Sequence, residues 1–129
     1  MELSAAQRER YERNLLVEGF TDRMQQALIA ARVAVVGAGG LGSAALNYLV
    51  AAGVGHLTLI ENDTVSLSNL QRQVLYTTAD MGRPKAEVAA MRLSRLNPGC
   101  DIRVVTDRLT AANAAGLLGG HDAVVDCTD

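Results

Sequence analysis

Cysteine is scarce in this sequence of 129 residues, which contains only Cys100 and Cys127. Two cysteines are too few for a disulfide framework, and neither belongs to a Cys-x-x-Cys pair of the kind used by zinc or redox sites. A reducing cytoplasm is therefore the expected location. Cys100 has no base or partner nearby in the sequence, so we do not expect it to act as a nucleophile.

Long apolar runs and an excess of either charge are also lacking. Glycines interrupt the longest apolar stretch, which is too short to span a bilayer, and the amino terminus lacks the apolar core of a secretory signal. The net charge is −2, and the basic residues are scattered along the chain. This balance argues against a broad surface for nucleic acid. We therefore expect neither a membrane nor a nucleic-acid partner.

The most informative segment that is present covers residues 32–43. Its apolar, β-branched run at 33–36 is typical of a strand buried on both faces of a parallel sheet. Gly37, Gly39 and Gly42 then match the dinucleotide-binding fingerprint, in which glycines permit a tight turn, close approach to phosphate and close helix packing. The start of the following helix would favour an anion. An ordinary tight turn without a ligand is the alternative.

Two acidic residues follow the next predicted strand. Glu61 and Asp63 lie about 20 residues after the glycine turn, the usual separation for an acid that holds a ribose hydroxyl. Because ATP, NAD and FAD all carry ribose, this pattern predicts a nucleotide without saying which one.

Residues 1–31 are expected to form a helical segment ahead of the sheet. The sequence predicts one helix over 4–17 with Ser4 as its N-cap, and a second over 22–31 with Asp22 as its N-cap. Three arginines crowd the first of these helices. Without further information, a solvated face explains that cluster.

Residues 32–129 alternate predicted strands and helices. This order is typical of a Rossmann-like α/β domain, a mostly parallel sheet with helices on both faces. The expected strands are 33–36, 57–60, 102–105 and 123–125, and the expected helices are 41–52, 84–96 and 111–118. The sequence stops just past the last strand, so we expect the sheet to be incomplete.

Two basic residues lie where a phosphate would bind. Arg72 is in a polar loop, 64–78, that leaves the carboxyl edge of the sheet, where α/β folds hold ligands. Its guanidinium suits phosphate, although a surface charge is an equal alternative. Lys85 is in the first turn of a helix that begins near Pro84. A cation there opposes the helix dipole unless an anion binds, so we favour phosphate binding over a solvated lysine.

Asp126 and Asp129 follow the last predicted strand. With right-handed crossovers, they emerge at the same edge of the sheet as the glycine turn. A carboxylate at this edge can hold Mg²⁺ beside phosphates, or it can cap a turn, which is a common role of aspartate. His56, at the start of the second predicted strand, is interpreted as a structural residue.

Several segments together resemble the ThiF/MoeB adenylyltransferases, the bacterial relatives of the ubiquitin-activating enzymes. The resemblance covers essentially the whole chain, and its most specific parts are 68–73 and 126–129. In sequence order, the matching segments are RYER at 10–13, GAGGLG at 37–42, ENDTVSLSNLQRQ at 61–73, GRPKA at 82–86, NP at 97–98 and DCTD at 126–129.

The resemblance implies an activity and a set of ligands. Such a protein binds Mg-ATP and adenylates the C-terminal glycine carboxylate of a ubiquitin-like sulfur-carrier protein, of the molybdopterin or thiamine type, and releases pyrophosphate. Arginine, lysine and Mg²⁺ would neutralise charge on the phosphoryl oxygens, so no protein nucleophile is needed. Carried over by position, Arg13, Arg72 and Lys85 are the catalytic residues. Arg13 would act across a homodimer interface on the ATP of the partner subunit.

The resemblance also assigns roles around the nucleotide. Glu61 would contact the ribose, Asn69 and Arg72 the triphosphate, Lys85 the phosphates, and Asp129 the magnesium. The complete set of implied nucleotide-binding residues is Gly37, Gly39, Gly40, Gly42, Glu61, Asp63, Ser68, Asn69, Leu70, Gln71, Arg72, Lys85 and Asp129.

The sequence departs from the family pattern in two ways. Many relatives carry aspartate where this chain has Glu61, so the contact to ribose is expected to be looser. The family's domain also continues past the position of Asp129 with further sheet and, in several members, a loop cysteine and two zinc-binding Cys-x-x-Cys pairs. We therefore expect the nucleotide-binding part of a longer enzyme, with little activity alone. An NAD- or FAD-dependent oxidoreductase domain and a non-catalytic dimerising domain are the alternatives.

Overall fold

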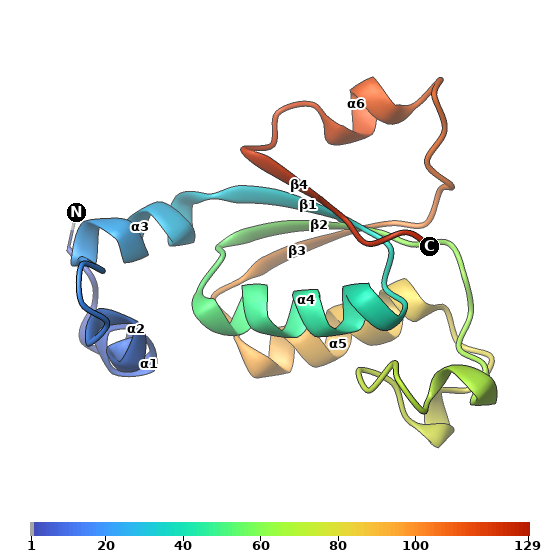
Figure 1. Ribbon diagram of the computed structural model, residues 1–129, viewed down its shortest axis with the longest axis horizontal. Helices are drawn as coiled ribbons and strands as arrows, with labels where there is room; N and C mark the ends of the chain where they lie inside the picture. Colours follow the sequence, from blue (N-terminus) through green and yellow to red (C-terminus); the bar gives the residue numbers. More distant parts are fainter. Residues whose placement is uncertain (1) are drawn as a thin grey trace.

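The computed structural model describes residues 2–129 and contains one four-stranded parallel sheet in the order β3-β2-β1-β4. Its strands are β1 (Arg32–Val36), β2 (His56–Ile60), β3 (Asp101–Val105) and β4 (Ala123–Asp126). Helices α4 (Gly40–Ala52) and α5 (Lys85–Leu96) lie on one face of the sheet, and α6 (Ala114–Leu118) lies on the other (Figure 1). The predicted Rossmann-like α/β class is confirmed.

The helices ahead of the sheet are α1 (Ala5–Arg10), α2 (Glu12–Leu15) and α3 (Asp22–Ala30). The prediction of one helix over 4–17 is wrong, because Tyr11 leaves the helical conformation between α1 and α2. Its ring is buried, and its hydroxyl accepts a hydrogen bond of 2.8 Å from Asn97. The N-cap of α3 is Thr21, not Asp22, because the Thr21 hydroxyl accepts from the amide of Met24.

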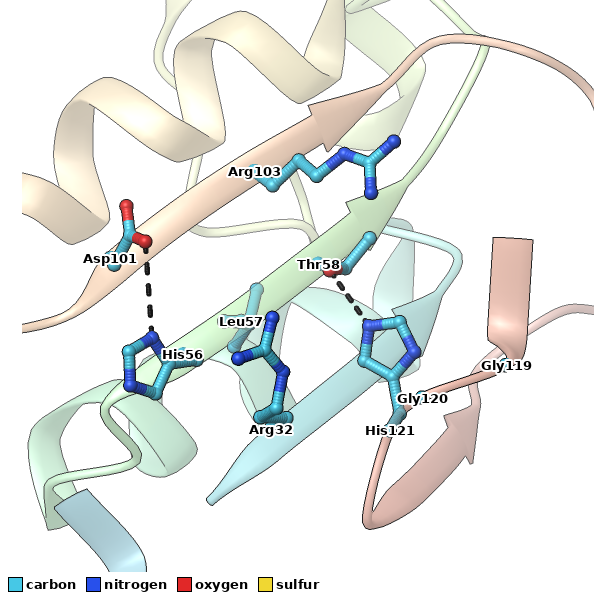
Figure 2. Close-up of a pocket in the computed structure, with 9 residues that line it drawn as sticks. All are labelled: Arg32, His56, Leu57, Thr58, Asp101, Arg103, Gly119, Gly120 and His121. Carbon is cyan, nitrogen blue, oxygen red and sulfur yellow. Dashed lines mark hydrogen bonds and ion pairs between the residues drawn. The ribbon is translucent and has the colours of Figure 1, made fainter. Parts of the chain in front are cut away.

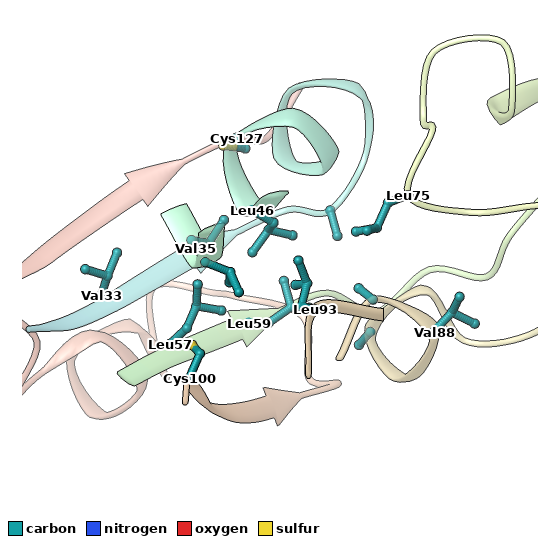
Figure 3. Packing of buried hydrophobic residues seen from close by; sticks show 14 of the residues in the cluster. Val33, Val35, Leu46, Leu57, Leu59, Leu75, Val88, Leu93, Cys100 and Cys127 are labelled. Carbon is teal, nitrogen blue, oxygen red and sulfur yellow. The ribbon is translucent and has the colours of Figure 1, made fainter. Parts of the chain in front are cut away.

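The main core lies between the sheet and helices α4 and α5 (Figure 3). Alternate residues of the strands face these helices, among them Val35 of β1 and Leu59 of β2, which are fully buried. Leu46 of α4 and Leu93 of α5 pack against them. This side of the sheet therefore holds the two helices whose amino ends matter for the site.

A smaller cluster forms the core on the face that carries α6. Val36, Ile60 and Val105 occupy the last positions of their strands there, and Leu117 and Leu118 of α6 pack against them. The helix predicted over 111–118 begins only at Ala114. The loop predicted over 64–78 holds the short 3-10 turn η1 (Leu67–Asn69), and η2 (Thr78–Asp80) begins at its end.

The strand register brings all four carboxyl ends to one edge of the sheet. Val36 pairs with Ile60 on one side and with Asp126 on the other, and Ile60 pairs in turn with Val105. The segments that follow the four strands therefore leave the sheet together. β4 is an edge strand, and its Val124 is 46% exposed.

In the described part of the chain, no helix combines the length and the apolar character that a membrane crossing requires.

Candidate nucleotide-binding site

A cleft of about 420 Å³ lies at the carboxyl edge of the sheet, between the glycine turn and the amino end of α5. Segments that follow β1, β2 and β4 all contribute to it. Its lining residues are Gly37, Gly39, Glu61, Asn62, Asp63, Gln73, Lys85, Arg108, Cys127, Thr128 and Asp129. The structure thus brings together many of the residues that the sequence predicted for a nucleotide.

The glycine turn requires glycine at two of its positions. Gly37 has φ of +96°, and a Cβ there would lie 2.8 Å from the carbonyl oxygen of Cys127. A Cβ at Gly42 would overlap the carbonyl oxygen of Gly37. The N-cap residue of α4, Gly39, makes no side-chain cap, so the first N–H groups of this 13-residue helix are not used by a capping side chain. An anion can use these groups.

Glu61 fixes the turn from the neighbouring strand. Its Oε1 accepts a hydrogen bond of 2.9 Å from the amide of Ala38, and its Oε2 accepts from the amides of Asn62 and Asp63 at 2.9 and 3.1 Å. The carboxylate therefore joins the ends of β1 and β2 while it lines the cleft. A ribose hydroxyl would share an oxygen that already holds the main chain in place.

A second set of contacts holds the glycine turn at the carbonyl oxygen of Ala38. The hydroxyl of Tyr76 donates a hydrogen bond of 2.7 Å to the carbonyl of Ala38, and Ser43 lies at 3.4 Å from the same oxygen. Tyr76 is only 4% exposed. Burial, with a smaller contribution from the charge of Glu61, raises the pKa of Tyr76 far above its usual value. The phenol therefore stays protonated and continues to donate.

Lys85 reaches the cleft from the first turn of α5. Its Nζ lies 3.3 Å from Oδ2 of Asp63, and its backbone amide donates to the carbonyl of Asp63 at 3.0 Å. The lysine side chain is buried, whereas that of Asp63 is exposed. A hydrogen bond from the amide of Thr64, aided by the charge of Lys85, holds the pKa of Asp63 below its usual range.

The loop after β2 places its basic residue beside the glycine turn. A Cβ at Gly40 would lie 3.5 Å from Cδ of Arg72, and the Arg72 guanidinium donates to the carbonyl of Ser68 at 3.3 Å. Asn69 accepts from the amide of Ser66, the N-cap residue of η1, and so completes a capping box. Leu70 packs against the main core.

Seven of the predicted nucleotide contacts that the structure describes are not among the residues that line the cleft. They are Ser68, Asn69, Leu70, Gln71 and Arg72 of the polar loop, and Gly40 and Gly42 in the first turn of α4. Their roles toward a nucleotide remain predictions.

The two aspartates after β4 differ in their surroundings. Oδ1 of Asp126 accepts from the hydroxyl and the amide of Thr128 at 2.6 and 3.1 Å, which lowers the pKa of Asp126. Asp126 is thus a turn cap, the alternative to metal binding. Asp129 lines the cleft and is exposed. One carboxylate suits a magnesium ion held mainly by phosphates and water. No cluster of three or more potential ligand residues occurs in the described chain.

The two thiols are buried and are not activated. Burial, together with the charge of Asp101, raises the pKa of Cys100 to about 11. Burial and the charge of Asp126 also raise the pKa of Cys127, which lines the cleft. Neither thiol is poised as a nucleophile at neutral pH.

Arg13 lies at the far end of α4 from the glycine turn. It is exposed on α2, and its neighbour Asn14 donates to the carbonyl of Ala52, the last residue of α4. A helix of 13 residues is about 20 Å long. The structure therefore does not bring Arg13 to the cleft of its own chain, and its action on a partner's site stays a prediction.

The predicted site residues do not include Asn62, Gln73, Arg108, Cys127 and Thr128, which also line the cleft. Arg108 follows β3, so the rule that ligands gather at strand carboxyl ends could have found it. Gln73 is the last residue of the segment 68–73, and the specific match of that segment to the family is the signal that could have found it.

A separate polar pocket of about 190 Å³ lies near the amino ends of the strands, away from the cleft (Figure 2). His121 contacts the hydroxyl of Thr58 at 2.9 Å, and His56 lies 3.8 Å from the carboxylate of Asp101. His56 is therefore remote from the candidate site, in keeping with the structural role predicted for it.

The open parallel sheet, the glycine turn and the cleft beside it are features that nucleotide-binding α/β domains share. Comparison with protein families makes this assignment specific. The model of the ThiF family matches residues 11–129. The chain belongs to the ThiF family.

Individual relatives agree with this assignment. The molybdopterin-synthase adenylyltransferase of Escherichia coli is 51% identical over 128 residues, which are 99% of this chain and 51% of that protein. The sulfur carrier protein adenylyltransferase of Thermus thermophilus is 50% identical over 121 residues, 94% of this chain and 45% of that protein. The chain thus spans about half the length of these adenylyltransferases.

Solved structures show the same fold. The tRNA N6-threonylcarbamoyladenosine dehydratase of Escherichia coli, determined in complex with ATP, superposes with a TM-score of 0.92 at 35% identity, over 100% of this chain and 53% of that one. MccB of Escherichia coli superposes with a TM-score of 0.85 at 29% identity, over 93% of this chain and 36% of that one.

Proposed function

We propose that this chain is the nucleotide-binding part of an ATP-dependent adenylyltransferase that activates the C-terminal carboxylate of a ubiquitin-like sulfur-carrier protein. The observation that carries the proposal is the cleft that joins the glycine turn, Glu61, Lys85 and Asp129. Two relatives are identical to this chain at about half of the positions, over nearly its whole length. One is a molybdopterin-synthase adenylyltransferase and the other a sulfur carrier protein adenylyltransferase.

The chemistry requires positioning and charge neutralisation. A carboxylate oxygen of the carrier forms a bond to the α-phosphorus, and the bond from that phosphorus to the bridging oxygen of pyrophosphate breaks. Lys85 supplies a buried cation, and the amino end of α4 supplies N–H donors to the phosphoryl oxygens. Magnesium, held by the nucleotide and Asp129, would add positive charge to the phosphates.

The remaining assignments follow from the same proposal. Glu61 holds the ribose, and Asn69 and Arg72 bind the outer phosphates from the loop beside Gly40. The side chain of Arg72 lies beside Gly40, next to the amino end of α4 that lines the cleft, which supports this assignment.

A homodimer is part of the proposal. Leu41 and Tyr48 lie seven residues apart on the same side of α4 and are 66% and 78% exposed. Leu16 and Val17, after α2, are 68% and 60% exposed. Exposed apolar side chains of this size favour an interface, and a partner there would bring in its own Arg13. The sedimentation coefficient of Tyr48→Glu, compared with that of the unsubstituted chain, tests the interface.

Two measurements test the function. Calorimetric titration of the chain should show binding of ATP that strengthens with Mg²⁺. The exchange of labelled pyrophosphate into ATP should depend on a sulfur-carrier protein ending in glycine, and should require the longer protein of which we propose this chain is the first half.

Other outcomes would favour the alternatives. Two results together would contradict the adenylyltransferase proposal and support an oxidoreductase domain. They are tight binding of NAD or FAD that does not depend on Mg²⁺, and no exchange of pyrophosphate into ATP with any carrier. Dimerisation without any nucleotide binding would support a scaffold.

A further inference from the structure

The polar pocket at the amino ends of the strands is lined by two arginines whose charges are unpaired (Figure 2). Arg32 belongs to β1 and Arg103 to β3, and neither guanidinium makes a hydrogen bond or an ion pair within residues 2–129. The pocket lies away from the nucleotide cleft, so the chemistry of the cleft does not account for these charges. Two unpaired cations at the wall of one cavity favour an anion there.

The strand register explains why the two arginines share a pocket. Arg32 is in register with His56 of β2, and Arg103 is in register with Thr58, two residues further along the same strand. Residues two apart in a strand face the same side of the sheet. On this side, α6 packs against the last position of each of these strands. The amino half of the face therefore stays open, and it carries charged groups where an α/β sheet usually carries apolar ones.

His121 holds the opposite wall of the pocket in place. Its Nδ1 lies 2.9 Å from the carbonyl oxygen of Leu118, which only accepts hydrogen bonds, so Nδ1 carries the proton of the neutral ring. Nε2 then accepts from the hydroxyl of Thr58 at 2.9 Å, and Thr58 is only 7% exposed. Both ring nitrogens are thus used within the protein, and the fold shapes the pocket without using its arginines.

The charge and the size of the pocket indicate a small oxyanion. Two arginines and a single carboxylate line it, so its formal charge is positive with neutral histidines. Guanidinium groups bind phosphoryl oxygens through parallel N–H donors. The volume of about 190 Å³ is less than half of the 420 Å³ of the nucleotide cleft. Sites for drug-sized ligands measure roughly 300–1,000 Å³, so this pocket suits an inorganic ion better than a second nucleotide.

The carboxylate of Asp101 favours one oxyanion over another. It lies 3.8 Å from Nδ1 of His56, and the side chain is 85% exposed, so it has room for a further hydrogen-bond donor. Hydrogen phosphate carries one P–OH group that can donate to a carboxylate, whereas sulfate carries none and is only repelled. A pocket that combines two guanidinium groups with one carboxylate therefore selects phosphate.

We propose that Arg32 and Arg103 bind an inorganic hydrogen-phosphate ion in this pocket, and that Asp101 accepts the hydrogen bond from its P–OH group. The site is separate from the nucleotide cleft, so this inference does not depend on the proposed function. Because only the folded sheet brings the two arginines together, bound phosphate should also stabilise the fold.

NMR titration of the isotope-labelled chain with inorganic phosphate, at constant ionic strength, tests the site. We expect saturable shifts of the amides of Gly120 and His121, in the pocket wall, with the same midpoint in the presence and absence of saturating ATP. Arg32→Met and Arg103→Met should each weaken phosphate binding about tenfold, because each removes a hydrogen bond between charged groups. Arg23→Met, at an exposed position of α3, is the matched control and should change nothing.

The choice between oxyanions has its own measurement. The unsubstituted chain should bind phosphate about fivefold more tightly than sulfate, which corresponds to about one hydrogen bond. Asp101→Asn should narrow this difference, because its amide group can donate to sulfate as well. Equal affinities of the unsubstituted chain for the two ions would overturn the role of Asp101.

Other results would overturn the site itself. Shifts that do not saturate, or equal midpoints for the pocket variants and the control, would mean that the arginines are only solvated. Shifts at the amide of Gly39 without shifts in the pocket wall would place the phosphate in the nucleotide cleft. If a methionine variant does not fold, glutamine at the same position should show the same loss. Failure of the chain to bind ATP would count against the proposed function and not against this site.

Discussion

Lys85 and Asp63 form an ion pair across the cleft, with 3.3 Å between Nζ and Oδ2, although one side chain is buried and the other exposed. The pair joins the first turn of α5 to the segment after β2. In this arrangement the carboxylate of Asp63 occupies the place beside Lys85 where an anionic group of a ligand would bind. Bound phosphates would take over that contact, since the exposed Asp63 can turn into solvent while Lys85 cannot.

Replacement of Lys85 by methionine should weaken ATP binding about thirtyfold, which corresponds to about 2 kcal/mol for a lost hydrogen bond to a charged group. Adenosine binding should not change. Calorimetric titration measures both, with Arg95→Met at the exposed end of α5 as the control. Equal ATP affinity for Lys85→Met and the unsubstituted chain would rule out a phosphate contact.

Lys85 is also the only lysine in the sequence. A lysine-specific acylating reagent can therefore modify only its Nζ and the amino terminus. We expect saturating ATP to slow modification of Lys85 at least fivefold and to leave the amino terminus unaffected, as measured by mass spectrometry of peptides. Adenosine should give no protection, because it has no phosphate to cover Nζ. Protection by adenosine equal to that by ATP would contradict the assignment.

Replacement of Tyr76 by phenylalanine should lower the free energy of unfolding by about 1 kcal/mol, because the carbonyl of Ala38 loses its shorter hydrogen bond. Ser43, at 3.4 Å, offers only a weak substitute. Urea unfolding measures the stability. Tyr48→Phe on α4 removes a hydroxyl but keeps the apolar ring that the proposed interface uses, so it is the matched control and should be neutral. A neutral Tyr76→Phe would mean that this hydroxyl does not support the turn.

Asp80 should make the stability of the chain depend on pH in the acid range. Burial would raise its pKa, but hydrogen bonds from Thr77 and the charges of Arg92 and Arg83 outweigh burial and lower it. A carboxyl with a lowered folded-state pKa stabilises the fold above its unfolded pKa, near 4, and loses this contribution as the pH falls through the folded value.

The replacement Asp80→Asn should therefore lower the free energy of unfolding by about 2 kcal/mol at pH 7. It should also remove part of the loss of stability that occurs at acid pH. Urea unfolding at pH 7 and at pH 3 measures the two effects, and Asp107→Asn in an exposed loop is the control. The same loss of stability at both pH values would show that the ionised form of Asp80 has no special role.

Much of the fold could be predicted because local patterns and global packing agree. The apolar run at 33–36 and the glycines after it specify a buried strand and a tight turn, and the structure contains both. The N-terminal segment could not be predicted in detail, since the break at Tyr11 depends on Asn97, which lies far along the chain. Local propensity favours one continuous helix there, and a tertiary contact overrides it.

The candidate site could also be predicted only where a local sequence pattern marks a residue. Glu61 and Lys85 have positional signals, the spacing from the glycines and a cation in a first helical turn. Arg108 has only the weaker signal of following a predicted strand, and Gln73 only that of belonging to the segment 68–73. The folded chain brings both to the cleft. Asp126 was ambiguous between a metal ligand and a cap, and its contacts with Thr128 support the cap.

The three amides that converge on Glu61 have a thermodynamic consequence for recognition. Because folding has already immobilised the glycine turn, a nucleotide that docks there does not need to order it. Less conformational entropy is lost on association, so a larger share of the contact energy remains as affinity. A chain with a slack turn would need additional contacts to reach the same dissociation constant.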